Sequence, residues 1–61
     1  MIERMMPMKT EEQAKRLAKE LNAMTGVWGA CTDKRMVIVS YLDEATVKVG
    51  RQKYDEIYDE D

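Results

Sequence analysis

The strongest pattern of apolar and polar positions in the chain is that of an amphipathic helix. Apolar residues recur at helical spacing, at Ala14, Leu17, Ala18, Leu21 and Met24. Thr10 and Gln13 precede these residues at the spacing of a capping box, in which the Thr hydroxyl accepts a hydrogen bond from the amide three residues on. Gly26 follows, and glycine readily adopts the left-handed conformation after a helix end. These signals predict a helix over residues 10–25 with one buried face.

Beyond Gly26 the pattern becomes that of an extended chain. Residues 27–32 begin with Val and Trp, residues 36–42 are rich in β-branched and aromatic side chains, and a polar segment around Asp33 and Lys34 separates the two runs. They predict an antiparallel β-hairpin over residues 27–42. Since the connection lacks the Asn-Gly or Asp-Gly pair of a tight two-residue turn, we expect a looser loop.

Residues 46–49 carry a weaker signal for a third strand. Val47 and Val49 alternate with polar neighbours, as in a half-buried strand at the edge of a sheet. The alternative is a helix that runs from Asp43 onward. The valines and Gly50 count against this helix because both residue types lower helix propensity. We therefore expect a strand and keep the helix as the alternative.

The two ends of the chain have no strong periodicity. Residues 1–9 contain four of the six methionines without a clean period, so an irregular lead-in is expected. Tyr54, Ile57 and Tyr58 have the spacing of one helix face among acidic residues, so residues 51–61 are expected to form a short acidic helix or tail. A helix of two or three turns is marginal without packing.

Together these elements predict a single small α+β domain. An N-terminal helix packs on a two- or three-stranded antiparallel sheet, and a short acidic C-terminal helix or tail follows. The strand predicted within residues 36–42 is apolar on both faces, and the first helix covers only one of them. The other face must be covered by the C-terminal segment, by a second copy of the chain in a homodimer, or by a partner. We expect Val37, Val39 and Tyr41 on or near that surface.

The composition argues against catalysis. The chain of 61 residues has no His, the usual general base and zinc ligand, and it has a single Cys. That residue, Cys31, is expected to be a small buried side chain. The acidic pairs lack the spacing of a calcium loop, and no Gly-rich phosphate loop is present. We therefore expect no enzymatic activity, no metal and no cofactor.

Charge is distributed unevenly along the chain. The last seven residues hold five acidic side chains and no basic one, whereas the whole chain has 10 Lys+Arg and 12 Asp+Glu. Such an end is either a solubilising tail or a segment that meets a basic surface on another protein. We expect partner binding through this end and through two aromatic residues of the hairpin. The candidate residues are Tyr54, Asp55, Glu56, Ile57, Tyr58, Asp59, Glu60, Trp28 and Tyr41.

The sequence thus predicts a small non-catalytic protein-binding module that blocks or modulates a larger protein. Small acidic domains without a catalytic site are common among proteins with which phages inhibit host machinery, an analogy of type rather than of sequence. A nucleic-acid enzyme is one candidate target, because an acidic segment can occupy a phosphate-binding surface.

The alternative function is a self-associating nucleic-acid-binding regulator. It would use Lys34 and Arg35 at the hairpin tip. The basic face of the first helix would add Lys15, Arg16 and Lys19. No apolar run has the length of a membrane span and no signal peptide is evident, so no membrane partner and a cytoplasmic location are expected.

Overall fold

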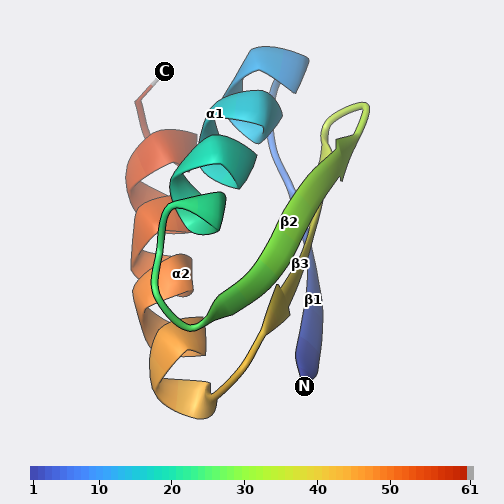
Figure 1. Ribbon diagram of the computed structural model, residues 1–61. Coiled ribbons are helices and arrows are strands. Elements are labelled where there is room, and N and C mark those ends of the chain that lie inside the picture. The colour runs from blue at the N-terminus through green and yellow to red at the C-terminus, as the bar shows by residue number, and fades with distance from the viewer. Residues whose placement is uncertain (61) are drawn as a thin grey trace.

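A computed structural model describes residues 1–60 and shows a three-stranded sheet with two helices (Figure 1). The elements are β1 (Ile2–Pro7), α1 (Glu11–Asn22), β2 (Val27–Asp33), β3 (Met36–Tyr41) and α2 (Glu44–Tyr58). The α+β class and the antiparallel sheet are confirmed. The predicted order is wrong at its start, because a strand precedes the first helix. Within residues 1–60, no helix is long and apolar enough to cross a membrane.

The first strand replaces the predicted irregular lead-in over residues 1–9. β1 pairs antiparallel with β3, and Met6 lies opposite Val37. Its side chains do alternate, since Met6 is 8% exposed and Met5 is 69% exposed. The sequence hides this alternation because methionine occupies both faces of the strand. Pro7 stands at the end of β1, where an edge strand tolerates a residue without an N–H.

β3 is the central strand, with β1 and β2 on either side of it. Both helices lie on one face of the sheet and leave the other face uncovered (Figure 1). Val37, Val39 and Tyr41 point toward the helices and are fully buried. The expectation that these three residues lie near a binding surface is therefore wrong. The core consists of Met6, Met8, Ala14, Leu17, Ala18, Leu21, Val37, Val39, Tyr41 and Ile57.

α1 confirms the predicted first helix and its cap. The Thr10 hydroxyl accepts from the Gln13 N–H at 3.1 Å. The Gln13 side chain accepts from the Lys9 N–H at 3.1 Å, and it also donates to the buried Ile57 carbonyl at 3.0 Å. It therefore ties the start of α1 to the end of α2. The helix ends at Asn22, and Gly26 takes a left-handed φ of 95° in the following loop.

α2 replaces the strand predicted at residues 46–49 and absorbs much of the C-terminal segment. The Asp43 carboxylate caps it by accepting from the Thr46 N–H at 2.8 Å and from the Thr46 hydroxyl at 2.7 Å. Gly50 lies against the Tyr41 ring, where a larger residue would not fit. The helical alternative for this segment is therefore the correct one. Of the predicted acidic helix or tail at residues 51–61, Asp61 lies outside the described residues.

The hairpin is confirmed, but its connection is tighter than expected. Asp33 and Met36 are paired, so only two residues connect the strands. Lys34 has a φ of 58°, the left-handed conformation that asparagine and glycine usually supply in such turns. The expectation of a looser loop is therefore wrong, because Lys34 adopts the left-handed conformation that a two-residue turn needs.

Candidate functional site

The helix-free side of the sheet carries a row of apolar side chains across all three strands. Met5 of β1 lies opposite Ile38 of β3, and Ile38 lies opposite Cys31 of β2. Side chains of directly opposed residues share one face of a sheet. Met36 adds a half-buried side chain next to this row on β3. We call these four residues together with Trp28 the open face.

Trp28 reaches the open face through an irregularity in β2. The register between β2 and β3 shifts between Val27 and Gly29, which leaves Trp28 as an extra residue. Val27 and Ala30 both pack against the core, so Trp28 and Gly29 between them turn away from the helices. A bulge of this kind redirects a side chain that strict alternation would place elsewhere. The indole is consequently 70% exposed.

The open face is unusually apolar for an uncovered surface. Met5 is 69% and Ile38 is 36% exposed. Cys31 is also exposed, so the expectation that it is a small buried residue is wrong. Antiparallel sheets normally place polar side chains on a face that no helix covers. Met5, Ile38 and Cys31 are neighbours across the strands, whereas the row of Glu3, Ser40 and Gly29 separates them from Trp28. Neighbouring exposed apolar side chains mark an interaction site more often than a scatter of single residues does.

The aromatic residues predicted to bind a partner are engaged within the molecule. Ile57 is 2% exposed and belongs to the core, as does the fully buried Tyr41. The Tyr54 hydroxyl donates to the Pro7 carbonyl at 2.7 Å. The Tyr58 ring packs against the core and lies 4.7 Å from the Lys9 ammonium. Among the candidate aromatic residues, Trp28 alone is largely available for contact.

The acidic residues predicted alongside them are exposed. Asp55, Glu56, Asp59 and Glu60 all lie on the surface. Asp55 approaches Arg51 at 3.8 Å, and Glu60 pairs with the Arg16 guanidinium of α1. These exposed carboxylates supply negative charge at one end of α2. They therefore fit a role in attraction rather than in close packing.

The basic residues proposed for nucleic-acid binding do not form one surface. Lys34 and Arg35 form the tip of the hairpin, at one end of the sheet. The three basic residues of α1 lie in the helical layer, behind the sheet as seen from the open face: Lys15, Arg16 and Lys19.

The titrating groups with shifted pKa values serve the fold. Burial raises the pKa of Tyr41, which the nearby Arg4 opposes. Burial also raises the pKa of Tyr54, with smaller contributions from Tyr58 and Asp55. Hydrogen bonds from the Thr46 side chain and backbone lower the pKa of Asp43. Within residues 1–60, no three His, Cys, Asp or Glu side chains are grouped as a metal site would require.

Comparison with protein-family models, curated proteins and solved structures finds no match to this chain. Function therefore has to be inferred from the geometry of the molecule itself.

Sequence reasoning found the doubly apolar strand but not which face stays open. Ile38 and Met36 alternate with the buried residues of β3, so the pattern contains them. Met5 could be found only once β1 is known to be a strand, and Cys31 only once β2 is in register with β3. The missing information is the placement of both helices on one side of the sheet.

Proposed function

We propose that this chain is a small non-catalytic protein-binding module that blocks or modulates a larger protein through its open face. The observation that carries the proposal is the row of Met5, Ile38 and Cys31, together with the exposed Trp28, on a sheet face without a covering helix. Tryptophan and methionine are enriched in the centres of protein interfaces, where burial of large side chains supplies most of the affinity.

The acidic end of α2 has a separate role in this proposal. Its exposed carboxylates attract a basic surface and speed the encounter, while the open face determines how long the complex lasts. This arrangement suits a target with a basic surface, such as a nucleic-acid enzyme. Inhibition then follows from steric occlusion of the target, as in phage inhibitors of host machinery.

The test captures the target from a lysate of the cells in which the protein occurs, on immobilised wild-type and variant chains. The wild-type chain should retain one stoichiometric protein, and Trp28→Ser and Met5→Ser should lose most of it. Val49→Ser is the matched control, because Val49 is 45% exposed but lies on α2, away from the open face. Equal retention by the wild-type chain and both open-face variants would overturn the proposal.

The acidic end is tested with the purified target. Changing Asp55, Glu56, Asp59 and Glu60 to Asn or Gln should slow association and flatten its salt dependence, with dissociation unchanged. Unchanged association rates would mean that this end is only a solubilising segment.

Sedimentation at several concentrations tests whether a second copy of the chain occupies the open face instead. A dimer that Trp28→Ser dissociates would assign the open face to that second copy.

Nucleic-acid binding is the second candidate, favoured by the exposure of Trp28 on a sheet that ends at Lys34 and Arg35. An exposed indole can stack on a base while neighbouring cations bind phosphate. The basic residues of α1 belong to the helical layer rather than to the open face, which limits the number of phosphate contacts near Trp28. Binding to single-stranded DNA or RNA that weakens steeply with salt would support this candidate. Absence of binding at low salt would reject it.

A further inference from the structure

The outer edge of β1 has backbone groups that point away from the sheet. The Met8 N–H donates to the Arg35 carbonyl at 2.8 Å, which sets the phase of the pairing between β1 and β3. Because residues in an antiparallel pair alternate in direction, Met6 and Arg4 bond to β3 in the same way. The N–H and C=O groups of Glu3 and Met5 therefore face outward. Glu3, Arg4 and Met5 are all exposed.

The other edge of the sheet is closed at its middle. On β2, Ala30 directs its N–H and carbonyl outward, and the Asn22 side chain binds both, at 2.8 and 2.9 Å. The amide of Asn22 thus takes the place of a neighbouring strand. On β1, among the described residues, the Glu3 carbonyl accepts from the exposed Arg4 guanidinium, and the Pro7 carbonyl accepts from Tyr54. The N–H groups of Glu3 and Met5 and the Met5 carbonyl are left for an incoming strand.

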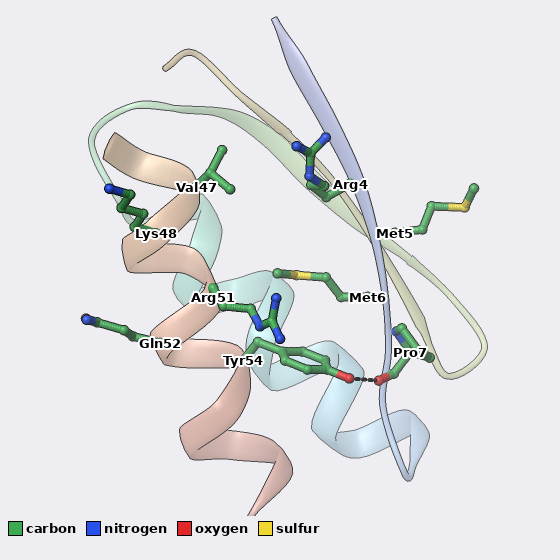
Figure 2. Close-up of a pocket in the computed structure, with 9 residues that line it drawn as sticks. All are labelled: Arg4, Met5, Met6, Pro7, Val47, Lys48, Arg51, Gln52 and Tyr54. Atoms are coloured by element: carbon green, nitrogen blue, oxygen red, sulfur yellow. Dashed lines mark hydrogen bonds between the residues drawn. The ribbon is translucent and has the colours of Figure 1, made fainter. Parts of the chain in front are cut away.

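A groove of about 640 Å³ lies between this edge and α2. Its volume is in the range of roughly 300–1,000 Å³ that is typical of ligand sites. Figure 2 shows Met6 pointing from β1 toward α2, with Arg51 and Tyr54 approaching from the helix. The hydrogen bond from Tyr54 to Pro7 closes one end of the groove. The groove exists because α1 packs over β2 and β3, whereas α2 contacts β1 only sparsely.

The groove has a cationic lining. Arg4, Lys48 and Arg51 all contribute to it, and none of its lining residues is acidic. This contrasts with the net charge of −2 for the whole chain. The local charge therefore favours an acidic occupant even though the protein as a whole repels one.

We propose that the β1 edge and this groove bind an extended acidic peptide segment of a partner protein by strand addition. The segment pairs with the outward backbone groups of Glu3 and Met5 and extends the sheet by one strand. Alternate side chains of an added strand face the helical layer, where Arg4 and Arg51 bind carboxylates. The site shares Met5 with the open face, but it uses the backbone of Met5 and the helical side of β1 rather than the apolar side chains of that face. It is therefore independent of the function proposed above.

A second copy of the chain fits this edge poorly. Antiparallel pairing of two β1 strands about Arg4 places the two Arg4 side chains opposite one another, and like charges in that position are destabilising. Pairing about Met5 places Glu3 opposite Pro7, which has no N–H and whose carbonyl is already bonded to Tyr54. An acidic strand from another protein meets neither obstacle.

The test uses a short peptide that alternates Glu with Val, a matched peptide that alternates Lys with Val, and the acidic peptide with N-methyl groups on alternate amides. Amide NMR of the ¹⁵N-labelled wild-type chain should show shifts and slowed exchange at Glu3 and Met5 with the acidic peptide. The Lys peptide should have little effect. The N-methylated peptide should bind several-fold more weakly, because it lacks the donors that pair with the Met5 carbonyl.

Two variant pairs test the edge and the charge separately. Met5→Pro removes an outward N–H and should abolish binding, whereas Met5→Ala should keep it. Arg4→Glu with Arg51→Glu should transfer preference to the Lys peptide, whereas Lys34→Glu with Arg35→Glu, an equal charge change at the hairpin tip, should not. Shifts centred on Ile38 and Cys31, equal binding of the N-methylated peptide, or self-association abolished by Met5→Pro would each overturn the proposal.

Discussion

Gly50 lies in the middle of α2, where glycine normally weakens a helix relative to alanine. Its value here is the absence of a side chain. A Cβ at this position would stand 2.7 Å from the nearest carbon of the Tyr41 ring and closer still to the hydroxyl. Tyr41 is fully buried between β3 and α2 and cannot move aside without disturbing the core. The glycine thus sets how closely the helix approaches the sheet.

Gly50→Ala should therefore destabilise the protein despite its better helix propensity. The gain in propensity is about 1 kcal/mol, whereas overpacking a core costs roughly 1–3 kcal/mol. Thermal unfolding followed by circular dichroism should show a lower Tm. Gly29→Ala is the control, because a Cβ there meets nothing within 4 Å, and its Tm should change little. A Tm raised by Gly50→Ala would contradict this prediction and would mean that the Tyr41 ring moves aside to accommodate the added methyl group.

At the level of elements, α2 depends on its cap as well as on its packing. The Asp43 carboxylate accepts two hydrogen bonds from Thr46 and lies at the N-terminus of the helix, where negative charge is favourable. These hydrogen bonds hold the pKa of Asp43 below its ordinary value of 3.8. A local signal of four residues therefore starts a helix in a segment whose valines favour a strand.

The lowered pKa of Asp43 predicts a pH-dependent contribution to stability. A carboxylate whose folded-state pKa is lower than its unfolded-state pKa contributes fully above pH 3.8 and loses that contribution as the pH falls through the folded-state value. Asp43→Asn keeps a capping oxygen but does not titrate. The wild-type chain should be the more stable at neutral pH, and the two Tm values should converge in acid. A constant difference between them at all pH values would contradict this assignment.

At the scale of the whole molecule, a single core between two layers holds the fold together. Leu17 and Leu21 of α1 are fully buried in it, as are Val37 and Val39 of β3. A domain near this size buries only about 60% of the surface that its unfolded chain exposes. The free energy of unfolding that is lost when one large core side chain is truncated is therefore a substantial fraction of the total.

Leu21→Ala should strongly destabilise the protein. Truncation of a buried leucine costs about 2–5 kcal/mol, against a total of roughly 5–15 kcal/mol for typical domains. Urea denaturation should show a much lower midpoint, with all elements lost together. Lys19→Ala, on the exposed side of the same helix, should change stability by less than about 0.5 kcal/mol. Separate transitions for the sheet and the helices would show that the core is not one cooperative unit.

Elements whose signals are local can be predicted from the sequence alone. α1 has its cap and its apolar stripe within one continuous segment, and the hairpin of β2 and β3 joins neighbouring strands by two residues. The apolar character of both faces of β3 is also evident in the sequence, whereas the prediction that something covers its second face stays a prediction. Such features require no knowledge of distant segments, because the interactions that form them lie only a few residues apart.

β1 and the site depend on contacts between segments that are distant in the sequence, and α2 depends on such contacts together with its local cap. Residues 2–7 become a strand because they pair with β3, 29 to 39 positions along the chain. Methionine occupies both faces of this strand, so the sequence shows no clear alternation. Residues 46–49 become helical because the Asp43 cap starts a helix there and Gly50 lets this helix pack against Tyr41. Both helices then cover the face that carries Val37, Val39 and Tyr41, so the other face and the β1 edge remain free. Packing between distant segments determines which face of a strand the helices cover. A strand that is apolar on both faces does not specify that face in its sequence.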